Sequence, residues 1–389
     1  MEYDVAIIGS GMSGTMAALR AIEKYKNAKI IVFEIGKKWG KRRRQLEGFL
    51  GAFPFSDGKI YENLSLDKDI LNWVNEYFKA AGPMKLNKDP GPSSSAKKIL
   101  SENGWKIKLN NYFQWKPEYI HQLSKLIANK FEKSDLTFKF DTEVEFINKE
   151  ENFILTTAKK ETFFAKNVIV ASGKSGWRWV TELYKNIGLK TNDDYATFGV
   201  RVEVPSSFMK EYKCHSILTK DQLTVGPFNW FGSIIPEDHA DLVISSFRSN
   251  EDRWKTDKVS FEFNKTIKFE NQGVYQSDRI GKLSLILFND KVSKERIRLF
   301  IKNKSQLNLL KEYNWMHSAL QELDKIIPEI SLKGNLCVPN IVPIPAKINL
   351  TDVFKTEIDG LYVVGENTGN NDILFAACSG ITAIDNILG

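Results

Sequence analysis

The chain opens with the stretch that decides its fold, Tyr3-Asp4-Val5-Ala6-Ile7-Ile8-Gly9-Ser10-Gly11-Met12-Ser13-Gly14. Its apolar run breaks on Gly9 and restarts with helical spacing through Met16, Leu19 and Ile22. A second apolar run, 30–33, follows and ends on an acid, Glu34. This order predicts a buried strand, a glycine turn, a helix and a second strand.

Each glycine in the turn has a separate physical task. Gly9 allows the tight turn, Gly11 lets the backbone approach a pyrophosphate, and Gly14 lets the helix pack closely on the strand. The amino terminus of the helix adds free N–H groups and partial positive charge. We therefore expect the turn to bind a dinucleotide through six consecutive residues: Gly9, Ser10, Gly11, Met12, Ser13 and Gly14. A tight turn without a ligand is the alternative.

Glu34 stands twenty positions after Gly14, at the end of the second predicted strand. A carboxylate at this distance can accept hydrogen bonds from the ribose hydroxyls of a bound dinucleotide. The strand, the helix and the acid agree with one another, which strengthens the dinucleotide interpretation.

Length and composition narrow the class of protein. A chain of 389 residues should form about two domains with sizeable cores. No apolar stretch reaches the ~20 residues of a membrane span, and no basic flank precedes the first strand. We expect a cytoplasmic protein that does not enter a membrane. Three widely spaced cysteines and four histidines without metal-ligand spacing argue against a disulfide framework, a redox dithiol and a metal site.

The net charge of +7 is partly concentrated in Lys37–Arg44, where six of eight residues are cationic. Such a segment is either a solvated loop or an anion contact, with the cofactor phosphates or with an acidic substrate. We include Arg42 and Arg43 among the candidate phosphate contacts.

Aromatic residues alternate with lysines between Trp105 and Trp115. This interleaving can stack on and neutralise a nucleic acid, but it is also typical of a half-buried strand with a charged outer face. Nucleic acid is therefore a partner that we consider but do not favour.

Further elements follow from periodicity. We expect helices over residues 65–81 and 117–133, a loop over 87–98, and short strands near 136–147, 153–158 and 162–165. The run 168–171 predicts a strand that ends at Ser172-Gly173; a P-loop is excluded because no glycine lies five positions earlier. A last strand ends at Gly365-Glu366, before a helix near 372–388 in which Gly380 suggests close backbone packing.

The middle of the chain differs in character. Between 190 and 340 we expect a mostly β cap domain, with strands at 198–204, 228–235, 242–247 and 283–288 and a helical stretch at 293–327. The fold class is thus α/β: a Rossmann-like domain from 1–189 and 341–389, with a parallel sheet and a β-meander, plus the cap at 190–340.

The order of these motifs resembles the FAD-binding flavoproteins of the glutathione-reductase-like fold. More narrowly, it resembles the FAD-dependent dehydrogenase family, related to aminoacetone oxidase-like flavoproteins. The resemblance covers most of the chain and rests on the residues from Gly51 to Lys59, on Gly173-Lys174-Ser175-Gly176 with Trp179, on Gly199–Pro205, on Gly365-Glu366 and on Ala376–Gly380. Family members usually carry cysteines where this chain has Trp39–Arg44, and Pro54-Phe55 also departs from the family form. The substrate is therefore not carried over.

The resemblance implies an extended FAD. Its pyrophosphate would lie over Gly11–Gly14, its adenosine ribose beside Glu34 and Ile35, and its adenine against the backbone of Val144. The resemblance also implies cofactor contacts at eight further residues, of which the last three form the helix amino terminus at the flavin pyrimidine edge: Ala171, Ser172, Gly173, Gly365, Glu366, Asp372, Ile373 and Leu374.

The implied activity is that of an FAD-dependent oxidoreductase. We expect hydride transfer between a small-molecule substrate and flavin N5, in a cleft between the FAD and cap domains. Only one G-x-G-x-x-G is present, so NAD(P)H would be at most a transient source of reducing equivalents. Catalytic candidates are Lys59, Asp57 and Arg44 beside the expected flavin ring, and Arg201, Trp230 and Arg248 on cap strands.

Three other functions compete with this one. The first is an FAD-dependent oxidase or lyase that modifies a nucleic-acid-linked base, docked on the basic and aromatic segments. The second is a flavin halogenase, suggested faintly by Gly176-Trp177-Arg178-Trp179. The third is a protein that binds FAD without catalysis.

Overall fold

Strand β1 (Glu2–Ile8) is the centre of a parallel arrangement. It pairs with β2 (Ile30–Phe33) on one side and with β10 (Thr162–Val170) on the other. Its residues 5–8 are buried because a central parallel strand is covered on both faces. Helix α1 (Met12–Lys24) follows the glycine turn, so the predicted strand, turn, helix and second strand are confirmed.

The computed structural model describes residues 2–42, 44–63, 66–239, 241–370 and 372–389. The chain divides into two units. Unit 1 comprises Met1–Lys85, Phe113–Asp193 and Ile344–Gly389, and unit 2 comprises Leu86–Tyr112 and Asp194–Pro343. The division drawn from the sequence placed residues 86–112 with the nucleotide-binding domain, whereas the structure groups them with unit 2.

The described part of unit 1 contains a seven-stranded sheet in the order β7-β2-β1-β10-β9-β8, with β22 also paired to β10. The first half of β10 pairs antiparallel with β9, and the second half pairs parallel with β22. The residues predicted as two strands, at 162–165 and 168–171, are therefore one strand that changes neighbours along its length. The parallel sheet with a β-meander is confirmed.

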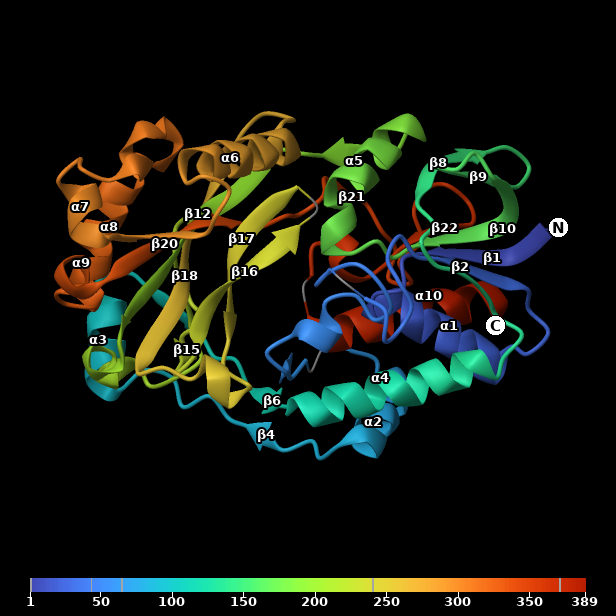
Figure 1. The fold of residues 1–389 in the computed structure, drawn as a ribbon, viewed down its shortest axis with the longest axis horizontal. Coiled ribbons are helices and arrows are strands. Elements are labelled where there is room, and N and C mark those ends of the chain that lie inside the picture. Colours follow the sequence, from blue (N-terminus) through green and yellow to red (C-terminus); the bar gives the residue numbers. More distant parts are fainter. Residues whose placement is uncertain (1, 43, 64–65, 240, 371) are drawn as a thin grey trace. The chain divides into compact units, whose positions relative to one another are not determined.

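Unit 1 has further elements, several of which Figure 1 labels, among them other strands of this sheet. Their bounds are β3 (Lys59–Tyr61), α2 (Lys68–Ala81), β6 (Tyr112–Gln114, at the unit boundary), α4 (Pro117–Glu132), β7 (Thr137–Lys139), β8 (Val144–Lys149), β9 (Phe153–Thr157), α5 (Trp177–Asn186), β11 (Thr191–Asn192), β21 (Lys347–Ile348), β22 (Leu361–Val363) and α10 (Ile373–Leu388), with short 3-10 turns at Phe53–Phe55, Lys174–Gly176 and Gly365–Thr368.

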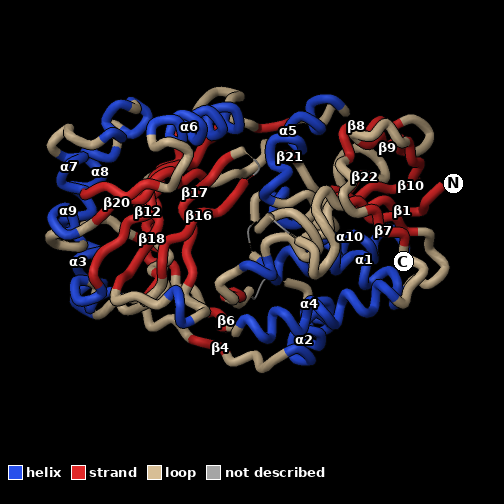
Figure 2. Tube along the Cα trace, in the orientation of Figure 1, coloured by secondary structure: helices blue, strands red, loops and turns tan. Residues whose placement is uncertain are grey.

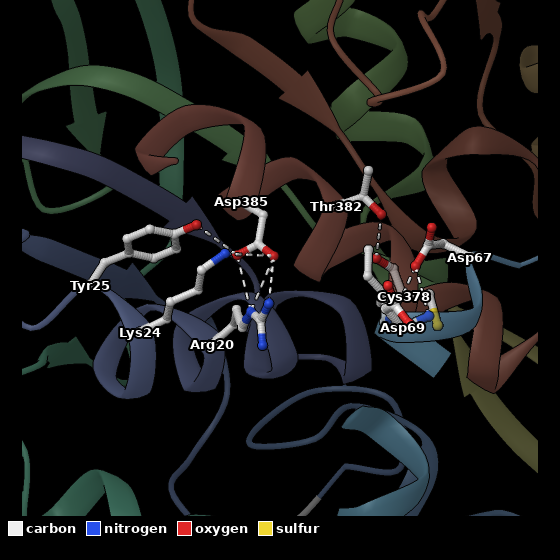
Figure 3. Close-up of polar contacts among 9 residues, drawn as sticks. Arg20, Lys24, Tyr25, Asp67, Asp69, Cys378, Thr382 and Asp385 are labelled. Carbon is white, nitrogen blue, oxygen red and sulfur yellow. Dashed lines mark hydrogen bonds and ion pairs between the residues drawn. The ribbon is translucent and has the colours of Figure 1, made fainter. Parts of the chain in front are cut away.

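Helices α1 and α10 pack against each other at backbone distance. A Cβ atom on Gly380 of α10 would lie 2.1 Å from the carbonyl oxygen of Ser13 in α1. The close packing suggested by a glycine in mid-helix is thereby confirmed. Farther along the same pair, Arg20 donates two hydrogen bonds to the carboxylate of Asp385, from Nε at 3.0 Å and from Nη2 at 2.8 Å (Figure 3).

A second group of polar residues in Figure 3 lies between α2 and α10. Asp67 caps α2, because its carboxylate accepts from the backbone N–H groups of Asp69 and Ile70. Cys378 lies on the facing side of α10, where burial and then the carboxylates of Asp372 and Asp67 raise the pKa of its thiol to about 12. This thiol is therefore protonated at neutral pH.

Unit 2 is built on an eight-stranded, antiparallel sheet (Figure 2). One face of its central strand β12 carries Val200, Val202 and Val204 into an apolar core shared with α6 and α8. The bounds in this unit are β4 (Leu86–Asn87), α3 (Ser94–Glu102), β5 (Lys106–Lys108), β12 (Tyr195–Pro205), β13 (Ile217–Lys220), β14 (Leu223–Val225), β15 (Asn229–Trp230), β16 (Ser233–His239), β17 (Leu242–Arg248), β18 (Lys258–Lys268), α6 (Gly273–Leu287), β19 (Ser293–Arg296), α7 (Ile297–Ile301), α8 (Met316–Ile326), α9 (Ile330–Lys333) and β20 (Asn335–Ile341). The predicted mostly β character with added helices is confirmed.

Three local predictions were wrong. The strand predicted at 283–288 is the end of helix α6, whose buried residues Ile280, Ser284 and Leu285 follow helical spacing. The helical stretch predicted from 293 begins instead as strand β19, paired with β20. The loop predicted at 87–98 contains the start of α3, because Ser93 is its N-cap and accepts from Ala96 N.

Two helices predicted from periodicity are confirmed. The helix expected at 65–81 is α2, and the helix expected at 117–133 is α4, which begins at Pro117. Within the described ranges, the helices are too short or too polar to cross a bilayer.

The packing of α10 on α1 can be tested by Gly380→Ala. In an isolated helix, alanine would be more favourable than glycine by about 1 kcal/mol. Here the added methyl group meets a backbone oxygen, so we expect a net loss of about 1–3 kcal/mol in unfolding free energy. Thermal and urea unfolding measure the change. Thr382→Ala on a partly exposed face of the same helix is the control and should change stability by less than about 0.5 kcal/mol; a stabilised Gly380→Ala protein would contradict the packing.

Candidate cofactor-binding site

The carboxyl ends of β1, β10 and β22 bring three distant segments together. Ala171 N donates to Ile8 O at 2.8 Å, and Val364 N donates to Val170 O at 3.0 Å. Gly365 N then donates to the hydroxyl of Ser379 on α10 at 3.0 Å. The carboxyl ends of strands in open parallel sheets are where ligands bind. This edge is therefore the candidate site.

Two of the three glycines in the turn are required by the fold itself. Gly9 has φ +98°, and a Cβ there would lie 2.4 Å from Ala171 O. A Cβ on Gly14 would lie 2.0 Å from Gly9 O. Both glycines are needed so that the turn can pass between α1 and the end of β10.

Gly11 differs from the other two glycines. Its φ is −63°, which any residue can adopt, and a Cβ there would meet only Ala171 O, at 4.0 Å. Neither backbone strain nor packing in the described chain explains a glycine at this position. A ligand that approaches the backbone closely does explain it.

The surroundings of Gly11 suit an anion. Gly11 is the N-cap of α1, and in the described chain no side chain caps this helix. The first helical turn, Met12-Ser13-Gly14-Thr15, contains no acidic residue. Its leading N–H groups have no partner within the helix, and the helix dipole adds partial positive charge. The turn therefore fits the pyrophosphate of a dinucleotide.

Glu34 is placed beside the turn, as expected, but its carboxylate is already hydrogen-bonded. Oε2 accepts from the backbone N and the hydroxyl of Ser10, each at 2.8 Å. Oε1 accepts from Gly36 N at 2.7 Å and Gly48 N at 2.8 Å. The side chain is buried, with 4% of the residue exposed. Its expected contact with a ribose stays a prediction.

The side chain of Arg42 is hydrogen-bonded to backbone carbonyl groups close to it in the sequence. Its guanidinium donates to the carbonyl oxygens of Glu47, Phe49 and Gln45 at 2.7–3.1 Å. Burial lowers the pKa of Arg42 to about 10, and the carboxylates of Glu34 and Glu47 oppose this shift. Arg42 thus holds its own loop together, and a phosphate would have to compete for its donors.

The neighbours of Arg42 lie differently. Arg44 is exposed and pairs with Glu47 at 2.9 Å, which is a surface contact and gives no sign of catalysis. Ile35 is also exposed. Arg43, predicted as a phosphate contact, lies outside the described residues.

Asn367 is a site residue that the sequence analysis missed. Its Oδ1 accepts from Gly173 N at 3.0 Å and from the hydroxyl of Ser172 at 3.2 Å, and its Nδ2 donates to Gly173 O at 3.3 Å. It therefore fixes the turn after β10 to the turn after β22. An amide that directly follows Gly365-Glu366 was the available signal, but its partners are nearly 200 positions away. Glu366 itself forms an ion pair with Lys174 at 3.6 Å.

The start of α10 lies in the same region of unit 1. Asp372 is the N-cap, and its Oδ1 accepts from Phe375 N at 2.9 Å. Leu374 is buried in one apolar cluster with Met12, Leu50 and Phe53. The amino termini of α1 and α10 thus share a cluster with the segment expected at the flavin ring. Ile373 packs against the edge of this cluster.

Val144, expected at the adenine, begins strand β8 and is buried. Two residues before Val144, the backbone N–H of Thr142 donates to Glu34 O at 3.0 Å. This contact brings the start of β8 next to the end of β2. The position agrees with the expected order of contacts along a dinucleotide but does not test the contact with adenine.

The segment with the catalytic candidates Asp57 and Lys59 is held in place by residues 114 and 115. Trp115 N donates to Gly58 O at 2.7 Å, and the amide of Gln114 donates to Asp57 O at 2.7 Å. The side chains of Asp57 and Lys59 form an ion pair with each other and are mostly buried. Because the two charges compensate each other, neither residue stands out as a base.

The other catalytic candidates belong to unit 2. Arg201 is buried and forms an ion pair with Glu262 at 2.7 Å; its Nη1 has no hydrogen-bond partner in the described chain. Trp230 donates its indole N–H to Cys214 O at 3.2 Å. Arg248 ends strand β17. The candidate site lies in unit 1, so these three residues are not part of it as described.

The aromatic segments serve the cores. Trp105 and Trp115 are buried, in units 2 and 1 respectively, so neither can stack on a nucleic acid. Trp177 is buried at the start of α5, and Trp179 donates to Glu145 O at 3.1 Å. Trp105, Trp115 and Trp177 therefore have structural roles.

All three cysteines are buried as free thiols. In the ranges that the structure describes, no group of three or more histidines, cysteines or acids is arranged to hold a metal ion.

The different roles of the turn glycines can be tested by alanine substitution. Gly14→Ala places a methyl group 2.0 Å from Gly9 O and should cost several kcal/mol or prevent folding. Gly11→Ala meets no close atom and should change the unfolding free energy by less than about 1 kcal/mol. Circular dichroism melts of the two variants make the comparison. Equal losses at the two positions would show that Gly11 is required by the fold.

Comparisons with known proteins give the following. No protein-family model matches the chain, and no curated protein matches its sequence. Solved structures match the chain at low identity, among them the following three. NikD, an amino acid oxidase essential for nikkomycin biosynthesis, is 10% identical with a TM-score of 0.45, over 100% of this chain and 94% of that one. Glycine oxidase from Geobacillus kaustophilus is 13% identical with a TM-score of 0.43, over 99% and 94%.

The third is L-α-glycerophosphate oxidase from Mycoplasma pneumoniae with FAD bound, which is 12% identical with a TM-score of 0.43, over 100% of this chain and 95% of that one. At this level of similarity, these structures identify neither a substrate nor a cofactor for this chain. The narrower resemblance to aminoacetone oxidase-like flavoproteins finds no counterpart among them and stays an expectation.

Proposed function

We propose that the chain binds FAD along the carboxyl ends of β1, β10 and β22 and acts as an FAD-dependent oxidoreductase on a small molecule. The observation that carries this proposal is Gly11. It is a glycine that the described protein does not need for its own packing, at a helix amino terminus without a side-chain cap. A pyrophosphate could approach the backbone closely at this glycine and accept hydrogen bonds from the N–H groups of the helix terminus.

The second helix terminus supports FAD over a smaller nucleotide. Helix α10 begins beside the turn, and Leu374 shares an apolar cluster with Met12. A dinucleotide bound at α1 could extend toward the start of α10, where N–H groups and partial positive charge would face electron-rich atoms. The motifs after Gly51 and around Gly173 that resemble FAD-dependent dehydrogenases agree with this direction.

When bound, the flavin supplies an acceptor for a hydride from an organic substrate. The chain itself binds and orients that cofactor. Gly11 and the first turn of α1 would hold the phosphates. Asn367 keeps the turns after β10 and β22 in register, and the apolar cluster around Leu50 and Phe53 would exclude water near the flavin. The buried pair of Asp57 and Lys59 positions the segment that would border the ring.

The cofactor assignment is tested by Gly11→Ala. The purified protein should be yellow or take up added FAD. The variant should bind FAD at least about tenfold more weakly, while its melting temperature without FAD shifts by no more than about 4 °C. The reason is that a methyl group at this position occupies space for the pyrophosphate without touching the protein. Flavin fluorescence titration gives the dissociation constants. A colourless protein that ignores added FAD would end the proposal.

The activity is tested by anaerobic reduction of the bound flavin. We expect one class of small metabolites, in a panel of amines, amino acids, hydroxy acids and sugar phosphates, to bleach the flavin absorbance without added nicotinamide. Bleaching by NADH or NADPH alone would instead place the reducing equivalents with a nicotinamide. A flavin reduced by dithionite but by no metabolite would favour a protein that binds FAD without catalysis.

A further inference from the structure

The four hydrogen bonds to Glu34 use up its acceptor capacity. A carboxylate offers about four lone-pair positions, and Ser10, Gly36 and Gly48 fill them at 2.7–2.8 Å. The residue is 4% exposed, so its remaining contacts are with protein. Four donors also offset the cost of burying the charge.

Two of the donors are the ends of one loop. Gly36 and Gly48 both donate to Oε1, and Phe49 N donates to Lys37 O at 3.2 Å. A Cβ on Gly36 would lie 2.3 Å from Gly48 N, so the ends of the loop touch. The segment 36–48, which the structure describes except for residue 43, therefore has both of its ends hydrogen-bonded to a single carboxylate oxygen. We call it the basic loop.

The other carboxylate oxygen fastens the basic loop to the glycine turn. Oε2 holds the N–H and the hydroxyl of Ser10, next to Gly11. Just beyond the basic loop, Leu50 N donates to Ser10 O at 2.7 Å, and a Cβ on Gly51 would lie 3.1 Å from the Cα of Gly11. The position of the phosphate-binding turn is thus coupled to closure of the loop through Glu34.

These contacts limit the role expected for Glu34 from its place in the sequence. Displacing the backbone N–H of Ser10, Gly36 or Gly48 would remove the acceptor of that group, at a cost of about 1–3 kcal/mol. A ribose hydroxyl could therefore replace only the hydroxyl of Ser10, which can rotate to another acceptor. The three backbone contacts of Glu34 remain in either case.

We propose that Glu34 is a positioning residue, which closes the basic loop and sets the glycine turn independently of any contact with the adenosine ribose. The placement of the glycine turn matters only if the proposed FAD site is correct. Closure of the loop does not rest on that proposal, because it is a property of the protein without cofactor. The basic loop then presents Lys38, Lys41 and Arg44 to solvent while Arg42 fills its interior.

The first experiment measures loop closure without FAD. Glu34→Gln keeps the shape of the side chain but turns one acceptor into a donor, so in either orientation of the amide at least one backbone N–H loses its partner. Limited trypsin digestion of the apo protein should cut the basic loop at least about tenfold faster in this variant than in the wild type. Mass spectrometry identifies cuts after Lys38, Lys41 and Arg44.

Glu47→Gln is the matched control. It removes one carboxylate charge from the same loop but leaves the contacts of Gly36 and Gly48 intact. Its cleavage rate should stay within about twofold of the wild type. Ser10→Ala, which deletes one of the four bonds, should give an intermediate rate and serves if Glu34→Gln does not fold. Wild-type cleavage rates in both Glu34→Gln and Ser10→Ala would overturn the role of Glu34 in closure.

The second experiment separates positioning from ribose binding. Dissociation constants are measured for FAD and for an FAD analogue that lacks both hydroxyls of the adenosine ribose, with wild type and with Glu34→Gln. We expect the variant to bind the analogue at least about tenfold more weakly than the wild type does, because an effect that acts through the loop needs no ribose hydroxyl. Equal affinity of the variant and the wild type for the analogue, with weaker binding of FAD alone by the variant, would show that Glu34 acts only on the ribose.

The two experiments fail separately. If the protein binds no FAD, the proposed function is lost, while the digestion of the apo protein still decides whether Glu34 closes the loop. If FAD binds and the digestion shows no difference, the function stands and this inference is wrong.

Discussion

The rest of unit 1 depends on how closely its backbone segments approach one another at the glycine turn. Gly14 lies against the carbonyl of Gly9, Gly9 lies against Ala171, and Gly380 lies against Ser13. At each contact a single methyl group would separate two elements. The fold therefore places α1, the end of β10 and α10 within a few ångströms, and this proximity creates an edge at which N–H groups from different parts of the chain converge.

The convergence has an electrostatic consequence. Helices α1 and α10 both begin at this edge, and aligned peptide dipoles leave partial positive charge at each beginning. The two acids at the start of the site are treated differently. Glu34 is enclosed by four donors, whereas Glu366 is partly exposed and faces Lys174. The turn is thus arranged to accept a negatively charged group, while hydrogen bonds satisfy the acceptors of the buried carboxylate of Glu34.

Much of the fold could be predicted because it depends on local pattern. Apolar runs and glycine spacing indicated β1, the turn, α1 and β2, and amphipathic periodicity with caps indicated α2 and α4. The errors have physical causes. The end of α6 is an apolar run that suits a strand equally well until its packing partners are known, and the serines before α3 act as a cap rather than as a loop.

Of the site, the sequence by itself determined which backbone could meet a phosphate, because glycine spacing and helix phase are local properties. It did not reveal Asn367, whose partners Ser172 and Gly173 lie far away in the chain. It also could not show that the acceptors of Glu34 are already used, since two of its donors belong to a loop whose closure is a tertiary event. Residue type and spacing determine which hydrogen bonds a side chain is able to make. The tertiary structure determines which partners lie within hydrogen-bond distance of it.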